Sequence, residues 1–533
     1  MVLVRLITRI IFLGSISILL TGIDRGISFK AAERFEVHFE DMSIPISIKE
    51  LNDWAIHQGE NNSELATWLN LLGFESRTSL ANFLQTPFSV EKEVALQLLR
   101  SWYGRKLFEE IGQLVRLDED KSGIEIFNTL EKMLESSRQL NVLYLFQSLP
   151  AEVIHLDLDG VVKVANRWRR ELKLQQKLVA DLSSISEKPS ESVNSIGPKL
   201  FKKDLKESFL RNIPLEVSHR DKPLNIEIWK PANNSLTRSN LIVFMPGLGG
   251  DQDHFRWLSR ILSYHGWPTV LIEHPGSDSE AIKALLDGSL PVPGLEVIPE
   301  RLADLQGVLS GIEQGILKVP GKNIVLMGHS LGSLTAFLAS GAEPQRSLKE
   351  SCSKALNDFS LTNLSELLQC QFTDFAIPSQ KPIKNLRAIV GINSFGSLLW
   401  PKYSTNSIDV PVFLVGGTFD LVTPAISEQL GLLLSIKPNP LNRVLLIEGA
   451  SHFSPVRVKG QINNEIGDDI FKLKGSLVGL HPLSVQSLIA NEIIKFLDNL
   501  EEEEAVPAEL NIIYNGTRFH LLDRPLVKEL LKS

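Results

Sequence analysis

The chain has 533 residues, of which 43% are hydrophobic and 22% charged, as in folded globular proteins, and it is too long for a single core. Its formal net charge of −8 argues against a nucleic-acid partner, because surfaces that bind phosphate are basic. Two cysteines, Cys352 and Cys370, exclude a disulfide-dense scaffold and a cysteine-rich metal site. We therefore expect two or more domains, no metal and no cofactor.

Residues 1–32 have the features of a signal peptide. Arg5 and Arg9 precede an apolar run from Ile10 to Ile23 that is short for a bilayer span. Ala31 and Ala32 are small enough for cleavage, although Lys30 departs from the usual pattern. The alternative is an uncleaved membrane anchor. Both interpretations predict export to the periplasm or the cell envelope.

Residues 33–182 are predicted to form an all-helical domain. Ser47-Ile48-Lys49-Glu50 is a plausible capping box, and apolar residues such as Leu51, Trp54 and Ala55 follow at helical spacing. These side chains are expected to form a core. The alternative is a face that meets a membrane peripherally or covers a catalytic site.

Residues 183–212 are serine-rich at first and are predicted to be a linker, after which short β-rich runs alternate with helical segments over residues 213–500. This alternation predicts an α/β domain with a mostly parallel sheet and helices on both faces. The predicted strands are Ile226 to Trp229, Leu241 to Met245, Thr269 to Ile272, Ile324 to Met327, Ala388 to Ile392, Val412 to Val415 and Val444 to Ile447.

Residues 341–385 are too long for a simple connection and are predicted to be a helical insertion above the sheet. Cys352 and Cys370 both lie in it, and either a disulfide or two buried free thiols fits the sequence. Its leucines predict either a roof over the active site or simple packing on the domain body. Residues 501–533 form a C-terminal tail in which a hairpin is expected around Asn515-Gly516.

The stretch Gly328-His329-Ser330-Leu331-Gly332 joins a predicted strand to a predicted helix. This is the pattern of a nucleophile elbow, in which a strained turn lifts the serine above the carboxyl edge of the sheet. Ser330 is therefore the candidate nucleophile.

An acyl-transferring serine needs a base and an acid that orients the base. In this fold they follow the serine in the order acid, then histidine. Asp420 follows the strand Val412 to Val415, and His452 follows Val444 to Ile447. Of the alternatives, His254, His265 and His274 precede the serine, His481 lies beyond the last strand, Asp409 precedes its strand, and Glu448 is close to His452.

The oxyanion hole is expected to use the backbone N–H groups of Leu331 and Leu248. Leu248 lies in Met245-Pro246-Gly247-Leu248-Gly249-Gly250, directly after a predicted strand. This loop superficially resembles a dinucleotide-binding motif, but Gln252 occupies the place of the third glycine.

Together, Met245-Pro246-Gly247-Leu248-Gly249, Glu273-His274-Pro275-Gly276-Ser277, the elbow, Asp420 and His452 resemble the platelet-activating-factor acetylhydrolase and dienelactone-hydrolase-like branch of the α/β-hydrolases. The N-terminal region resembles the domain of unknown function that precedes such hydrolases in a cyanobacterial exported family. The resemblance implies a Ser330–His452–Asp420 triad. Pro246 departs from it, since these enzymes usually have histidine there.

The expected activity is hydrolysis of lipid-like or short-chain carboxylic esters through an acyl-enzyme. The alternatives are acyl transfer to an alcohol by the same triad, or a non-catalytic envelope scaffold that keeps the fold.

Overall fold

The structure is a computed structural model. It describes residues 32–57, 63–69, 73–87, 92–118, 120–136, 141–185, 190–191, 208–231, 237–287, 289–290, 293–357, 363–378, 380–402, 408–457, 481–505 and 507–532. The predicted signal peptide, residues 1–32, lies outside these ranges except for Ala32. Within them, no helix combines the length and hydropathy needed to cross a bilayer.

The chain divides into two compact units. The first comprises Met1–Arg169 with Lys283–Val292, and the second comprises Arg170–Ile282 with Pro293–Ser533. Helices α9 (Leu158–Ile185) and α11 (Ser279–Leu286) include residues of both units.

The first unit contains a four-stranded sheet in the order β2-β1-β4-β3. Its strands are β1 (Arg34–Phe39), β2 (Met42–Ser47), β3 (Val115–Leu117) and β4 (Val153–Asp157). β1 is parallel to β4 and antiparallel to β2, and β3 is antiparallel to β4. The prediction of an all-helical domain is therefore wrong. Phe35, Val37 and Phe39 alternate with polar residues, which is the period of a strand.

Helices account for most of the rest of this unit. They are α2 (Ile48–His57), α3 (Glu64–Leu69), α4 (Phe74–Gln85), α5 (Lys92–Arg100), α6 (Trp102–Leu114), α7 (Ile124–Glu135), α8 (Val142–Ser148) and the start of α9. Ser47 precedes α2 as predicted, and its Oγ accepts a hydrogen bond from Glu50 N at 3.4 Å. Trp54 is fully buried beside Ala55, so this part of the predicted core is correct.

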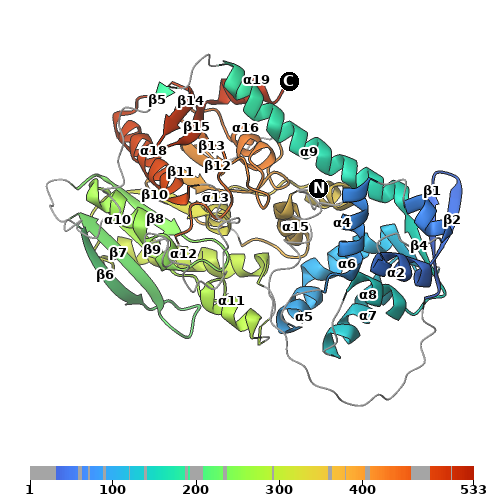
Figure 1. The fold of residues 1–533 in the computed structure, drawn as a ribbon. Helices are drawn as coiled ribbons and strands as arrows, with labels where there is room; N and C mark the ends of the chain where they lie inside the picture. The colour runs from blue at the N-terminus through green and yellow to red at the C-terminus, as the bar shows by residue number, and fades with distance from the viewer. Residues whose placement is uncertain are drawn as a thin grey trace. The chain divides into compact units, whose positions relative to one another are not determined.

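The second unit is built on an eleven-stranded sheet in the order β5-β14-β15-β13-β12-β11-β10-β8-β9-β7-β6. The strands are β5 (Ser190–Glu191), β6 (Ser208–Leu215), β7 (Leu224–Pro231), β8 (Asn240–Met245), β9 (Thr269–Ile272), β10 (Asn323–His329), β11 (Leu386–Ile392), β12 (Val412–Gly417), β13 (Arg443–Ile447), β14 (Glu509–Tyr514) and β15 (Thr517–Leu522). The six strands from β13 to β9 in this order are parallel. All the strands predicted from the sequence lie within observed strands, and the fold is α/β with a mostly parallel sheet (Figure 1).

One segment differs from its predicted role as a linker, and the predicted C-terminal hairpin has a further role in the sheet. Ser208 to Asn212, at the end of the predicted linker, belong to β6, which pairs with β7. The hairpin around Asn515-Gly516 extends the sheet, because β15 pairs with β13. Turn chemistry identified the hairpin, but the attachment of β15 to the sheet depends on a partner far away in the sequence.

The helices that follow lie wholly or partly in the second unit. They are α10 (Arg256–Tyr264), α11, α12 (Ile298–Glu313), α13 (Leu331–Ala339), α14 (Leu348–Asn357), α15 (Leu364–Cys370), α16 (Gly431–Ser435), α18 (Pro482–Glu502) and α19 (Arg524–Leu530), with short helical turns η3 (Gln252–His254), η4 (Leu295–Val297), η6 (Gln371–Thr373) and η7 (Ile426–Leu430).

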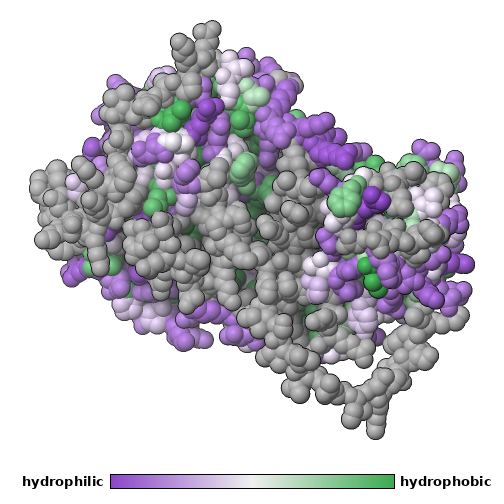
Figure 2. Space-filling view, viewed as in Figure 1, coloured by the Kyte–Doolittle hydropathy of each residue, from purple (hydrophilic) through white to green (hydrophobic). Residues whose placement is uncertain are grey.

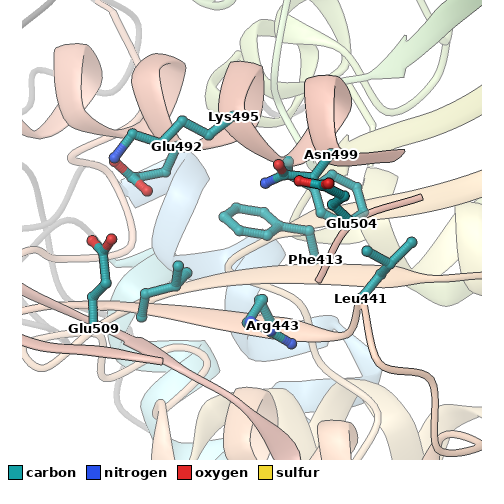
Figure 3. Close-up of a pocket in the computed structure, with 10 residues that line it drawn as sticks. Phe413, Leu441, Arg443, Glu492, Lys495, Asn499, Glu504 and Glu509 are labelled. Atoms are coloured by element: carbon teal, nitrogen blue, oxygen red, sulfur yellow. The ribbon is translucent and has the colours of Figure 1, made fainter. Parts of the chain in front are cut away.

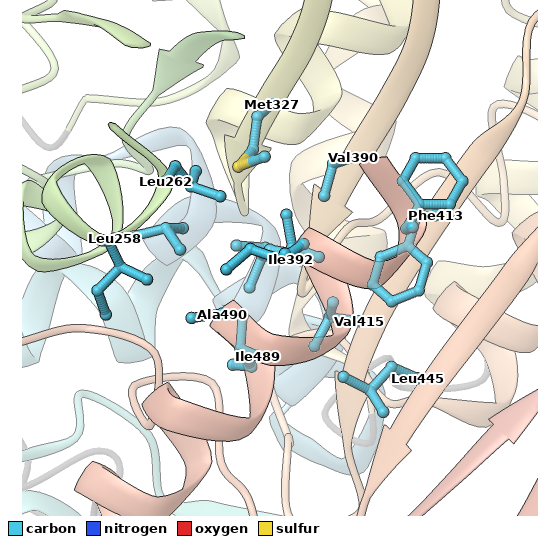
Figure 4. Packing of buried hydrophobic residues seen from close by; sticks show 14 of the residues in the cluster. Leu258, Leu262, Met327, Val390, Ile392, Phe413, Val415, Leu445, Ile489 and Ala490 are labelled. Carbon is cyan, nitrogen blue, oxygen red and sulfur yellow. The ribbon is translucent and has the colours of Figure 1, made fainter. Parts of the chain in front are cut away.

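The main core lies between the sheet and helices α10 and α18. One buried cluster contains Leu258 and Leu262 of α10, Ile489 of α18, and Met327 and Val390 of the central strands (Figure 4). Helix α13 packs on the opposite face, because a Cβ at Gly391 of β11 would lie 2.6 Å from Ser333 Oγ. Both faces of the central strands are thus buried, as expected for a parallel sheet.

On the face shown in Figure 2, hydrophobic residues form small separate patches among hydrophilic ones. Isolated exposed apolar side chains are ordinary on soluble proteins.

Candidate active site

Ser330 lies in a sharp turn between β10 and α13. Its backbone has φ 51° and ψ −116°, which non-glycine residues rarely adopt. The flanking glycines permit this turn, since a Cβ at Gly328 would lie 2.2 Å from the Gly332 backbone, and one at Gly332 would lie 1.9 Å from the Met245 carbonyl oxygen. The local geometry is that of a nucleophile elbow.

Asp420 and His452 lie after neighbouring strands, β12 and β13, and are in contact. His452 Nδ1 is 2.9 Å from Asp420 Oδ2, and Asp420 is completely buried. Two parallel strands end at the same edge of the sheet, so residues 32 positions apart are brought together. The pair has the arrangement of an orienting carboxylate and its imidazole.

The carboxylate of Asp420 is held by further donors. Its Oδ1 accepts hydrogen bonds from the backbone N–H groups of Val422 at 2.9 Å and Thr423 at 2.7 Å. Its Oδ2 accepts one from Thr423 Oγ1 at 2.7 Å. These donors fix the orientation of the carboxylate toward His452.

The loop that bears His452 is tied to the residue before the serine. The His452 carbonyl oxygen accepts hydrogen bonds from His329 Nε2 at 3.0 Å and from Asn393 Nδ2 at 3.1 Å. Burial, together with the nearby His452, holds the pKa of His329 well below its usual range, so this ring is neutral at pH 7. Sequence reasoning missed the role of Asn393, which directly follows β11 and has φ 49°.

Among the described residues, Ser330 Oγ has no hydrogen bond to His452. The neighbouring rings of His329 and His452 have centroids 5.0 Å apart, which brings the base to the elbow. In enzymes without substrate, a catalytic hydrogen bond is often long and tightens when substrate binds.

The loop after β8 lies against the elbow. A Cβ at Gly247 would be 3.2 Å from Ser330 Cβ, so Gly247 lies next to the serine. Leu248 is the following residue in the chain. No hydrogen bond to Leu248 N–H is present within the described residues. Leu331 is the first residue of α13, and its N–H therefore has no carbonyl partner within the helix. Both N–H groups are available to an oxyanion.

Arg301 of α12 forms a hydrogen bond with the loop that follows β8. Its side chain is buried and donates to the Pro246 carbonyl oxygen at 2.5 Å, to Ser277 Oγ at 2.7 Å and to Thr335 Oγ1 at 3.2 Å. Burial lowers the pKa of Arg301 to about 9, so the guanidinium remains charged at pH 7. The Arg301 side chain thus forms hydrogen bonds both with the loop before Leu248 and with helix α13, which follows Ser330.

A second buried network lies next to Arg301. Asp304 accepts from His274 Nδ1 at 2.9 Å, from Arg220 at 2.6 and 2.8 Å, and contacts His219 Nε2 at 2.7 Å. Burial opposes ionisation of Asp304, but these hydrogen bonds outweigh it and lower its pKa. Burial and the charge of Arg301 lower the pKa of His274 to about 4. His274 is thus engaged away from Ser330, in agreement with its rejection as the base.

Three of the remaining alternatives are also engaged elsewhere. Glu448 contacts His520 Nε2 of the C-terminal hairpin at 2.9 Å, and Asp409 pairs with Lys437 at the surface. His254 Nδ1 accepts from the Asp251 backbone at 3.0 Å.

The insertion is helical, as predicted, and carries a disulfide. Cys352 of α14 and Cys370 of α15 are bonded, with a Cα–Cα distance of 5.4 Å. The insertion is also fixed by the buried Glu428, which accepts from Asn363 at 2.6 Å and Ser397 Oγ at 2.7 Å. It is therefore attached to the loop that follows β11.

A pocket elsewhere in the second unit is separate from the site formed by Ser330, Asp420 and His452. It lies at the amino ends of β12 and β13, because Phe413 and Arg443 are among the first residues of those strands, whereas Ser330, Asp420 and His452 follow the carboxyl ends (Figure 3). Its lining is Phe413, Leu441, Arg443, Glu492, Lys495, Phe496, Asn499, Glu504, Glu509 and Leu521.

Comparison with known proteins gives one family. Residues 31–157 match the family model described as "Alpha/beta hydrolase of unknown function (DUF1400)". No curated protein gives a significant match. The matched residues belong to the first unit, whereas the elbow belongs to the second. By this match the chain is similar to the alpha/beta hydrolases, a family that indicates hydrolysis and leaves the substrate open.

Proposed function

We propose that the protein is a serine hydrolase of carboxylic esters, with Ser330, His452 and Asp420 as its triad. The observation that carries the proposal is the 2.9 Å contact between the buried Asp420 and His452. The carbonyl oxygen of His452 also accepts a hydrogen bond from His329, the residue that precedes the strained Ser330. An orienting acid, a base and a serine in an elbow are the parts that acyl transfer requires.

In the first half-reaction, Ser330 Oγ attacks the acyl carbon while His452 Nε2 takes the hydroxyl proton. The N–H groups of Leu248 and Leu331 hold the oxyanion. The carbon–oxygen bond to the alcohol then breaks, and His452 returns its proton to the departing alkoxide. In the second half-reaction, water replaces the alcohol, attacks the acyl-enzyme with His452 as base, and releases the acid and free Ser330.

The substrate class is an ester with an apolar acyl or alkyl group. Leu364, Leu367 and Leu368 of the insertion are only partly buried, and Phe453 packs edge-on against His452 with centroids 5.4 Å apart. We infer that these side chains line the site, where apolar walls favour apolar groups over sugars or charged acids. This choice agrees with the sequence resemblance to the platelet-activating-factor acetylhydrolase branch. We further propose that the protein acts after export, as residues 1–32 indicate.

A fluorophosphonate probe tests the proposal directly, because it phosphonylates an activated serine. The full chain should be labelled, with the adduct mapped to Ser330, and Ser330→Ala should not be labelled. Ser333, on the same helix but hydrogen-bonded to Ser394, provides the control: Ser333→Ala should keep labelling. An unlabelled wild type, or labelling that survives Ser330→Ala, rejects the triad. A panel of p-nitrophenyl esters with and without added alcohol then separates hydrolysis from acyl transfer.

A further inference from the structure

Three metal-ligating side chains lie on one face of the four-stranded sheet in the first unit, apart from the proposed triad. Glu36 and His38 are two residues apart on β1, so both point to the same face. His155 of β4 is the direct neighbour of Glu36 in the parallel register. β1 and β4 are adjacent in Figure 1, and the two histidines are 117 residues apart in the sequence.

The ligand atoms of these side chains converge. His38 Nε2 is 2.9 Å from His155 Nδ1, His155 Nδ1 is 3.5 Å from Glu36 Oε2, and all the ligand atoms lie within 4.8 Å of one another. A tetrahedral cation with bonds of about 2.0–2.2 Å separates its ligand atoms by roughly 3.3 Å. The distances of 2.9 and 3.5 Å lie on either side of this spacing, so a cation can replace the proton between the two imidazoles with small side-chain shifts.

The two imidazole rings lie close together. They are stacked with centroids 5.2 Å apart and an interplanar angle of 26°. The side chains of His155 and Glu36 are 23% and 27% exposed, which leaves a route for an ion and room for water. The competing cation is Arg34, whose guanidinium is 3.8 Å from Glu36. At that distance and exposure, the ion pair contributes little to hold the carboxylate.

We propose that Glu36, His38 and His155 form a binding site for a divalent transition-metal cation, with Zn²⁺ the best fit. Two imidazoles and one carboxylate are a common zinc ligand set, and water supplies the fourth position. Asp157 is the register neighbour of His38, but its Oδ1 accepts from Gly160 N at 2.9 Å and is therefore engaged. The site does not depend on the proposed esterase activity.

The test measures Zn²⁺ binding to the full, chelator-treated protein by titration calorimetry, with Co²⁺ absorption reporting tetrahedral coordination. The wild type should bind about one Zn²⁺ per chain. His38→Gln, His155→Gln and Glu36→Gln should each weaken binding at least about 10-fold. Because the chain has 11 histidines, the control is His57→Gln, at the exposed end of α2, which should bind like the wild type.

Circular dichroism and thermal melting without metal identify any variant that fails to fold. If one histidine variant unfolds, the other and Glu36→Gln still test the site. Zn²⁺ should raise the melting temperature of the wild type and of His57→Gln more than that of the site variants. No saturable binding by the wild type, or binding that the site variants retain, overturns the proposal.

Discussion

The buried guanidinium of Arg301 donates a hydrogen bond to the carbonyl oxygen of Pro246, two residues before the proposed oxyanion donor Leu248. This contact links helix α12 to the loop after β8. A carbonyl held by a buried hydrogen bond restricts the direction of the peptide groups that follow, so we propose Arg301 as a positioning residue for the oxyanion hole.

Arg301→Lys should therefore lower kcat by about 10- to 100-fold with a smaller change in KM, because oxyanion stabilisation is realised mainly in the transition state. Steady-state kinetics on a p-nitrophenyl ester measures both. Arg387→Lys, a partly exposed arginine paired with Glu503, is the matched control and should behave like wild type. A rise in KM at unchanged kcat would contradict the positioning role.

The triad should act as a unit. Ser330→Ala and His452→Ala should each reduce kcat by on the order of 10⁴-fold or more, and the double variant should cost little beyond either single change. The experiment is a double-mutant cycle on kcat/KM, with melting temperatures confirming that each variant folds. If the fold-losses in kcat/KM of the two single variants multiply in the double variant, the two residues act independently and the assignment is rejected.

The insertion should set acyl-chain preference. Each buried methylene should contribute up to about 0.8 kcal/mol to transition-state binding until the pocket is full, after which kcat/KM should fall. Leu364→Ala, Leu367→Ala and Leu368→Ala, measured across a series of acyl lengths, should include a variant whose optimum moves to longer chains. A flat series, or three unchanged optima, would show that the leucines only pack on the domain body.

The disulfide should stabilise the protein. Its cysteines are 18 residues apart, and closing a loop of this size contributes about 3 kcal/mol in the chain-entropy model. Thiol titration of unfolded, unreduced protein should find no free thiol, and Cys352→Ser with Cys370→Ser should lower the melting temperature. Two free thiols per chain from protein made in an oxidising compartment would contradict the bond.

His274 should make stability depend on pH. Its pKa in the folded protein is about 4, below its ordinary 6.5, so between these values the unfolded chain binds more protons. The stabilisation is complete above pH 6.5 and is lost as pH falls toward 4, with a slope of up to about 1.4 kcal/mol per pH unit. Unfolding free energies from pH 7.5 to 4.5 should fall less steeply for His274→Asn than for wild type or the exposed control His57→Asn. Equal slopes would refute the linkage.

The sequence alone predicted those turns and strands whose conformation is set by residues close together in the chain. The glycines around Ser330 identify a turn that side chains would block, and Asn515-Gly516 identifies a hairpin. Six of the seven runs predicted as strands belong to parallel strands, which are nearly continuously apolar because both of their faces are buried. Asp420 and His452 were named from their positions after two such strands, and their roles remain a proposal.

Only the tertiary structure decided which distant residues meet. The first unit was predicted to be all-helical because its helices dominate the periodicity, whereas β1 and β4 are short and are stabilised by pairing across more than a hundred residues. The same holds for Arg301 with Pro246, for Asn393 with His452, and for His38 with His155. A hydrogen bond between residues far apart leaves no short-range pattern, because strand register and helix packing, not local propensity, bring its atoms together.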